Sequence, residues 1–181
     1  GGSSDAAAAL GLANALLPEP LPDDALHRLA AGLGADVPFL LRGGTQLGTA
    51  DGSVLAPLEL PTDYAVLLVL PEGAEKESTR AVYERFDEGG GAEGFELRRA
   101  ALLAALEPIE HARDLAALPP NDLATSPLAD ELRKSGAFRA DVTGAGPAVY
   151  GLFERDDQAA DVRESLGAKG RTWLARPVPR P

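Results

Sequence analysis

The amino-acid sequence predicts an α+β fold with two domains, residues 1–60 and residues 61–181. Residues 6–17 consist mainly of Ala and Leu, which are strong helix formers. Residues 64–70, in contrast, form a continuous apolar run, which is typical of a strand in the centre of a sheet. With 45% hydrophobic and 25% charged residues among 181, the chain has enough apolar side chains for a real core in each domain.

The first domain begins with two predicted helices. Residues 6–17 lack a polar face, so we expect this helix to be buried on most sides. A second helix starts at Asp23 and Asp24 and ends at Gly32 or Gly34, which completes an αα-hairpin. Residues 39–41 then read as a short apolar strand, and residues 45–49 and 53–58 as a β-hairpin around an Asp-Gly turn.

The second domain alternates strands and helices after the strand at residues 64–70. Ser78 is a good N-cap for a helix that extends to Arg85, and Ser126-Pro127 is a good start for another. The further helices are expected at residues 95–106, 109–118, 128–135 and 156–166, and the further strands at residues 140–143, 148–153 and 171–175. The resulting β-α-β-β-α-β order, with a helical insertion, predicts a ferredoxin-like domain.

Composition narrows the class of partner. A net charge of −11 and a pI near 4.6 argue against binding of a nucleic-acid backbone, which needs clustered Lys and Arg. No apolar run approaches the roughly 20 residues that span a bilayer, so no membrane association is expected. The chain has no Cys, which excludes disulfides, thiolate nucleophiles and Cys-type zinc sites. We therefore expect a cytoplasmic protein with a small-molecule partner.

The first five residues, Gly-Gly-Ser-Ser-Asp, directly precede the first predicted helix. Glycines would let backbone N–H groups approach an anion, and the helix N-terminus would supply more donors and partial positive charge. The hydroxyls of Ser3 and Ser4 could contact phosphate or Mg²⁺. The alternative is an ordinary N-cap, because Ser and Asp are favoured at any helix start.

Asp36 is predicted to lie between the end of a helix and an apolar strand. A carboxylate there would be partly desolvated and could act as a general base. The alternative is a simple turn residue ahead of Val37-Pro38.

Residues 143–147, Thr-Gly-Ala-Gly-Pro, join two predicted strands. Gly144, Ala145 and Gly146 would let this segment approach a ligand closely, although a tight hairpin turn would use the same residues.

Two further segments are ambiguous from the sequence alone. Thr79 and Tyr83 share one face of a predicted helix and could contact a phosphate and stack on a base, or serve as cap and core. Asn121-Asp122 follows two prolines and favours a turn over a polar site.

A resemblance to a known family lies in five segments that occur in one order: GGSSDAAAAL, GLGADVPFLLRGG, ESTRAVY, PPNDL and VTGAGPAVYGLF. Together they resemble the GHMP kinases, and within that family the enzymes that act on 4-diphosphocytidyl-2-C-methyl-D-erythritol. The resemblance extends from Gly1 to about Phe153, and GADVPF is its most specific piece. It implies a GHMP kinase fold without its N-terminal strands, and a ferredoxin-like C-terminal domain.

The resemblance also implies an activity, namely phosphorylation of the 2-hydroxyl of that substrate by ATP with Mg²⁺, in non-mevalonate isoprenoid precursor biosynthesis. Asp36 corresponds to the catalytic aspartate of the family, and Ser4 to a Mg²⁺ contact. The resemblance implies that ATP binds to Gly1, Gly2, Ser3 and Ser4. It implies that the substrate binds to Thr79 and Tyr83, and that Gly144, Ala145 and Gly146 form the third motif of the family.

The family's N-terminal part has no counterpart in this sequence. That part carries the first half of the phosphate loop, a catalytic lysine and a Tyr-His pair that recognises cytosine and ribose, so we expect this piece to be inactive alone. Two alternatives stay open: another GHMP small-molecule kinase, and a non-catalytic ligand-binding or interaction module.

Overall fold

The computed structural model describes residues 2–74 and 77–178. These residues divide into two compact units, residues 2–59 with Val178 and residues 60–177.

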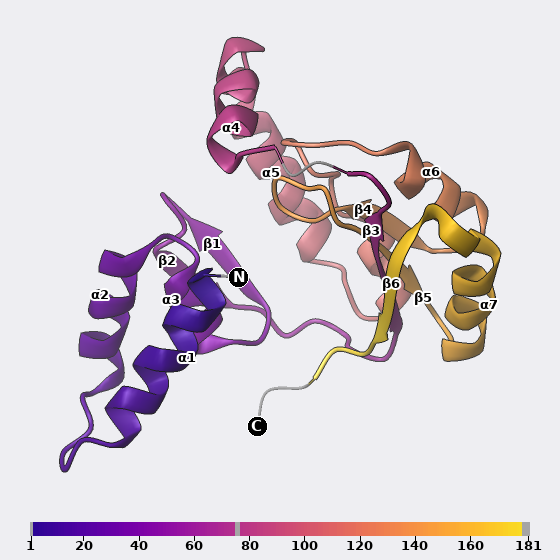
Figure 1. The fold of residues 1–181 in the computed structure, drawn as a ribbon. Helices are drawn as coiled ribbons and strands as arrows, with labels where there is room; N and C mark the ends of the chain where they lie inside the picture. The colour runs from indigo at the N-terminus through magenta and orange to yellow at the C-terminus, as the bar shows by residue number, and fades with distance from the viewer. Residues whose placement is uncertain (1, 75–76, 179–181) are drawn as a thin grey trace. The chain divides into compact units, whose positions relative to one another are not determined.

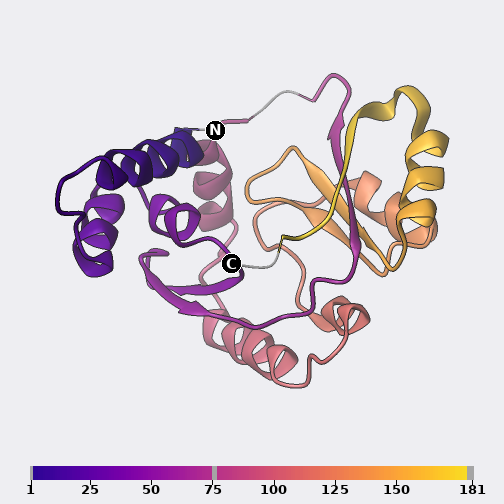
Figure 2. The ribbon, with the colours of Figure 1, turned by 90° about the horizontal axis from the view of Figure 1, so that it is seen from below.

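The first unit consists of three helices and a β-hairpin (Figure 2). The helices are α1 (Gly2–Ala15), α2 (Asp23–Leu33) and α3 (Val37–Arg42), and the hairpin strands are β1 (Gln46–Thr49) and β2 (Val54–Pro57). The αα-hairpin and the antiparallel β-hairpin are confirmed. Residues 39–41, predicted as a strand, are helical instead. Pro38 in the first turn fixes a helical φ, and Gly43 ends the helix after six residues, which is too short for periodicity to reveal.

The core of the first unit is small. Its buried cluster consists of Ala7, Ala30 and Val37, one residue from each helix, with a few half-buried neighbours. The prediction that the helix at residues 6–17 is buried on most sides is wrong, because Leu12 on α1 is 69% exposed and Leu16, just after the end of α1, is 85% exposed. Within this unit only the face of α1 toward α2 and α3 is covered, so apolar composition alone did not indicate burial.

Two hydrogen bonds fasten the β-hairpin to the helices. The imidazole Nε2 of His27 on α2 lies 2.9 Å from the carbonyl oxygen of Ser53, where it must act as the donor. The guanidinium of Arg42 on α3 donates to the carbonyl oxygen of Leu55 at 3.2 Å. The hairpin is thereby held beside the segment that joins α2 to α3.

The second unit contains a four-stranded antiparallel sheet in the order β4-β5-β3-β6 (Figure 1). The strands are β3 (Ala65–Pro71), β4 (Arg139–Val142), β5 (Val149–Phe153) and β6 (Gly170–Ala175). This order is that of a ferredoxin-like domain, and β3 is a central strand, as its apolar sequence predicts.

The described residues of the second unit include six helical segments: α4 (Thr79–Glu88), α5 (Phe95–Leu106), the 3₁₀-helix η1 (Ala112–Ala117), α6 (Pro127–Lys134), α7 (Asp156–Leu166) and the 3₁₀-helix η2 (Gly167–Lys169). The expected α-helix at residues 109–118 is only the shorter η1, because Asp114 accepts N–H groups at its start and Leu118, directly after it, is extended.

Helices α6 and α7 pack on the same face of the sheet, where the main core lies (Figure 1). Leu67 from β3, Leu132 from α6 and Phe153 from β5 are fully buried there. Burial of such side chains stabilises a fold by about 1.5–3 kcal/mol each. This core makes the sheet a rigid support for the turn between β4 and β5.

Candidate active site

The residues expected to bind phosphate lie in the first turn of α1, which begins at Gly2. Gly2, Ser3 and Ser4 are therefore helical, and the prediction of a loop before the helix is wrong for them; Gly1 lies outside the described residues. Although these residues are helical, their backbone N–H groups can still bind an anion, because the first N–H groups of any α-helix have no acceptor within the helix. A Cβ added at Gly2 would meet nothing within 4 Å, and the hydroxyl-bearing Ser4 is exposed. The start of α1 is thus open to an anion.

Asp36 is the N-cap residue of α3 and its side chain makes no capping hydrogen bond. It is exposed, so the expected partial desolvation is wrong, because the chain turns inward only at the buried Val37 and Pro38 that follow. Val37 shares its buried cluster with Ala7, one helical turn after Ser4. Asp36 and the start of α1 therefore lie at neighbouring points on the border of one core.

The turn of the β-hairpin packs against the same segment. A Cβ at Gly52, whose φ is +92°, would lie 3.6 Å from the carbonyl oxygen of Ala35. The tight turn at Gly52 thus supports the backbone just before Asp36.

Helix α4 carries the residues expected on the substrate side. Ser78 caps it by accepting the N–H of Ala81 at 3.1 Å. Thr79 and Tyr83 lie one turn apart on α4, and Tyr83 is 50% exposed, which excludes the alternative of a core tyrosine. Both side chains remain available to a ligand.

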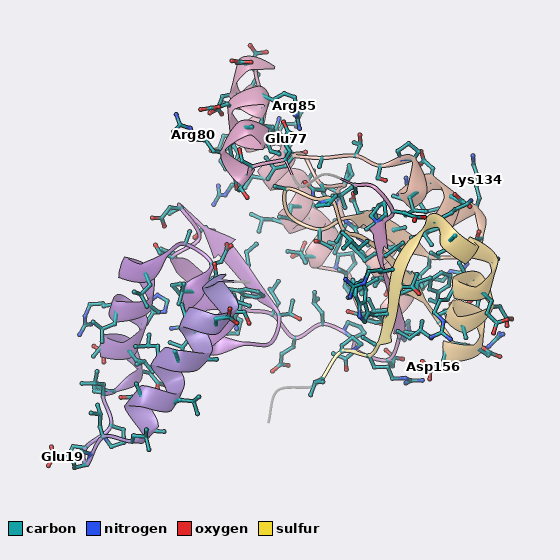
Figure 3. The ribbon with its side chains drawn as sticks, in the orientation of Figure 1. Glu19, Glu77, Arg80, Arg85, Lys134 and Asp156 are labelled. Atoms are coloured by element: carbon teal, nitrogen blue, oxygen red, sulfur yellow. The ribbon has the colours of Figure 1, made fainter. Side chains whose placement is uncertain are left out.

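Charged pairs surround this part of α4 (Figure 3). The guanidinium of Arg85 lies 2.6 Å from the carboxylate of Glu77, which raises the pKa of Arg85. Arg80 pairs in the same way with Glu84 at 2.7 Å. These exposed pairs order the side chains around the start of α4 while contributing little to stability.

The Gly144–Gly146 segment forms a tight turn between β4 and β5. The N–H of Thr143 donates to the carbonyl of Ala148 at 2.8 Å, and the N–H of Gly146 donates to that of Thr143 at 2.9 Å. Gly144 has a φ of +53° and Gly146 a φ of +80°, so both positions favour glycine. A Cβ at Gly146 would also come within 3.3 Å of the Val142 side chain. The hairpin turn is thus real, and its glycines are required by the backbone.

Sequence reasoning underrated Asn121. Its side-chain amide donates to the carbonyls of Val142 at 2.9 Å and Gly144 at 2.7 Å, while its Oδ1 accepts the N–H of Leu123 at 2.8 Å. Asn121 is therefore a turn residue, as composition indicated, but it also holds the Gly144–Gly146 turn. No local pattern could reveal a contact made across more than twenty residues of sequence.

Two charged residues complete this network. The carboxylate of Asp141, which is buried, accepts the N–H of Asn121 and the N–H of Val142, each at 2.8 Å. Arg139 lies 3.8 Å from that carboxylate and donates to the carbonyls of Leu118 and Pro119 at 2.6 and 2.7 Å. These bonds fasten the segment that carries Asn121 to strand β4.

The expected site residues thus fall into two groups. One, in the first unit, comprises the start of α1 and Asp36; the other, in the second unit, comprises α4 and the Gly144–Gly146 turn. In the part of the chain that the structure describes, no three His, Asp or Glu side chains converge as metal ligands would. A helix able to cross a bilayer is likewise not found among residues 2–74 and 77–178.

Comparisons with known proteins give one family. Residues 92–172 match the family described as GHMP kinases C terminal. The chain is 34% identical, over 99% of its length, to 63% of a 4-diphosphocytidyl-2-C-methyl-D-erythritol kinase from Prosthecochloris aestuarii. It is 41% identical, over 93% of its length, to 56% of the kinase of the same name from Salinispora tropica.

Solved structures of two kinases are also similar to this chain. A crystal structure of 4-(cytidine 5'-diphospho)-2C-methyl-D-erythritol kinase superposes with a TM-score of 0.68 and 28% identity, covering 97% of this chain and 64% of the other. Mevalonate kinase from L. major matches with a TM-score of 0.57 and 16% identity, over 87% of this chain and 59% of the other, which shows a shared fold alone.

The chain spans 63% of the relative from Prosthecochloris aestuarii and 53% of one from Gloeobacter violaceus. Two matches nevertheless extend over nearly all of this chain, 99% for the relative from Prosthecochloris aestuarii and 97% for the solved structure of the kinase. The chain therefore belongs to the GHMP kinases, with the family's C-terminal region in residues 92–172.

Proposed function

We propose that this chain forms part of a kinase that transfers the γ-phosphoryl group of ATP to the 2-hydroxyl of 4-diphosphocytidyl-2-C-methyl-D-erythritol. The observation that carries the proposal is the identity of 34% to a kinase of that name over 99% of the chain. The likeness to mevalonate kinase, at 16% identity, supports the fold without favouring mevalonate as substrate. Use of ATP as the phosphoryl donor also favours the expected cytoplasmic location.

The start of α1 is the proposed triphosphate site. Its free N–H groups and the helix dipole favour an anion, and the open space beside Gly2 leaves room for the phosphates. The exposed hydroxyl of Ser4 is an oxygen donor of the type that Mg²⁺ prefers, so Ser4 would hold the ion together with phosphate oxygens. Bound Mg²⁺ would neutralise charge on the transferred group.

Asp36 is the proposed general base. Its exposed carboxylate can accept the proton of the substrate's 2-hydroxyl while that oxygen bonds to the γ-phosphorus and the bond to the ADP oxygen breaks. The packing of Val37 against Ala7 supports this role, because it keeps Asp36 near the start of α1. Thr79 and Tyr83 are the proposed contacts for the substrate, with the ring of Tyr83 free to stack on cytosine.

The test is ADP release by the protein that the gene encodes, with 4-diphosphocytidyl-2-C-methyl-D-erythritol, mevalonate and homoserine offered separately. Turnover of the first alone is expected. Turnover of mevalonate or homoserine instead would assign the chain to another GHMP kinase, and no turnover of any would favour the non-catalytic module.

Asp36→Asn tests the proposed base. Loss of a general base should lower kcat by about 100- to 10,000-fold while ATP affinity stays unchanged. Asp23→Asn is the matched control, because Asp23 is an exposed carboxylate in the first turn of α2 in the same unit. Equal rates for the two variants would remove Asp36 from the catalytic role.

A further inference from the structure

The turn between β4 and β5 contains two successive backbone N–H groups that the fold does not use. Thr143 and Gly146 donate to carbonyls within the turn, whereas the N–H groups of Gly144 and Ala145 have no acceptor among the described residues. Gly144 has a φ of +53°, which is left-handed. Successive N–H groups around a left-handed residue form a concave site suited to an anion.

Asn121 decides which way this site faces. Its amide holds the Gly144 carbonyl at 2.7 Å. In a trans peptide the C=O and the next N–H point in opposite directions, so the N–H of Ala145 is directed away from Asn121. Without that hydrogen bond, the Gly144–Ala145 peptide could turn over, because glycine permits both orientations. The turn would then present a carbonyl oxygen, which repels an anion, in place of an N–H.

Asn121 is itself held from two sides. Its N–H donates to the carboxylate of Asp141, and its Oδ1 accepts the N–H of Leu123, each at 2.8 Å. Asp141 is only 7% exposed and is anchored further by the N–H of Val142. The amide of Asn121 therefore has little freedom, and its orientation is transmitted directly to the turn.

We infer that Asn121 is a positioning residue of the kinase, which fixes the Gly144–Ala145 peptide so that the N–H of Ala145 donates to a phosphate oxygen of the reactants. This inference rests on the proposed function. According to this inference, the Gly144–Gly146 turn donates a hydrogen bond to a phosphate, and Asn121, which lies outside the turn, sets the direction of that donor.

The first experiment uses Asn121→Asp in the protein that the gene encodes. Aspartate keeps the size of the side chain and the acceptor for Leu123, but it removes the amide donor to Gly144. A loss in kcat/KM of up to about 100-fold is expected, as for other misplaced contacts to a reacting group. Asp122→Asn is the matched control, since it makes the reverse change at the next residue and breaks only the ion pair with Arg98.

Asn121→Ser supports this comparison, because its hydroxyl can still donate and should restore part of the activity. Activity of Asn121→Asp equal to that of Asp122→Asn would overturn the inference. An equally large loss of kcat/KM in Asn121→Ser and Asn121→Asp, with both variants melting at the temperature of the wild type, would also overturn it. If the unmodified protein shows no turnover, the proposed function fails, and the next measurement still tests the turn.

That measurement needs no variant. In ¹H–¹⁵N spectra of the unmodified protein, the Ala145 amide should shift downfield when inorganic phosphate, ADP or the diphosphocytidyl substrate is added. The amide of Gly136 is the control, because its N–H already donates to Arg133 in a turn elsewhere in the unit. No selective shift of the Ala145 amide with any of the three probes would overturn the inference, whether or not the Asn121 variants fold.

Discussion

Gly2 and Gly32 are two helical glycines with open space where a Cβ would stand. Alanine is favoured over glycine by about 1 kcal/mol in a helix interior, so Gly32→Ala, in the last turn of α2, should raise the free energy of unfolding by less than that amount. Gly2→Ala should likewise raise it by less than that amount, because Gly2 lies in the first turn of α1. The two should differ in ATP binding, which the methyl group at residue 2 would obstruct. Equal ATP affinities, measured by calorimetry on both variants, would contradict the placement of the triphosphate at α1.

The charged form of Asp114 accepts hydrogen bonds that stabilise the fold. Its carboxylate accepts the N–H groups of His111 at 2.8 Å and Glu110 at 3.0 Å, and these bonds lower the pKa of Asp114 from its ordinary value. Its contribution to stability is therefore present above about pH 4 and is lost as the pH falls through the lowered pKa. Asp114→Asn should flatten the fall in stability between pH 5 and about 3, measured by urea unfolding at each pH. An unchanged slope would show that the carboxylate is not bonded in solution.

At the scale of elements, α4 and α6 both begin with a serine N-cap but differ in how many of their residues are buried. Ser78 caps α4, where only Val82 is buried, whereas Ser126 caps α6, where Ala129 and Leu132 are buried. Replacement of such a cap by alanine costs about 1 kcal/mol. Ser126→Ala should lower the global free energy of unfolding by about that amount, while Ser78→Ala should mainly speed hydrogen exchange within α4. Equal global effects would mean that α4 unfolds only together with the sheet.

The success of sequence reasoning varied with the length of each element. The bounds of α5 and α7 were predicted to the residue, because eleven or twelve residues give a clear start and end. The six-residue α3 was missed, since an apolar run that short fits a strand equally well. The start of α1 was placed too late, because Gly and Ser read as loop formers. The role of Asn121 depends on tertiary hydrogen bonds that leave no periodic trace.

At the scale of the whole molecule, the core around α6 and the sheet should dominate stability. Leu132 is fully buried in it, so Leu132→Ala should cost about 2–5 kcal/mol. Leu97 on α5 is 77% exposed, and Leu97→Ala should change stability by less than about 0.5 kcal/mol. The only tryptophan, Trp173, lies on β6, so its fluorescence during urea unfolding reports on this unit. Equal midpoints for the two variants would contradict the core described.

The position of β3 in the sheet also affects how the chain folds while it is being translated. β3 is the first strand of its unit to leave the ribosome, yet its two neighbours are β5 and β6, at residues 149–153 and 170–175. A nascent chain therefore carries the apolar segment Ala65–Pro71 without both of its partner strands until residues 170–175 have been translated. Such an open strand is prone to aggregation. Ribosomes that stall before residue 170 should thus release products that depend on chaperones, whereas chains that contain both β5 and β6 can pair both edges of β3.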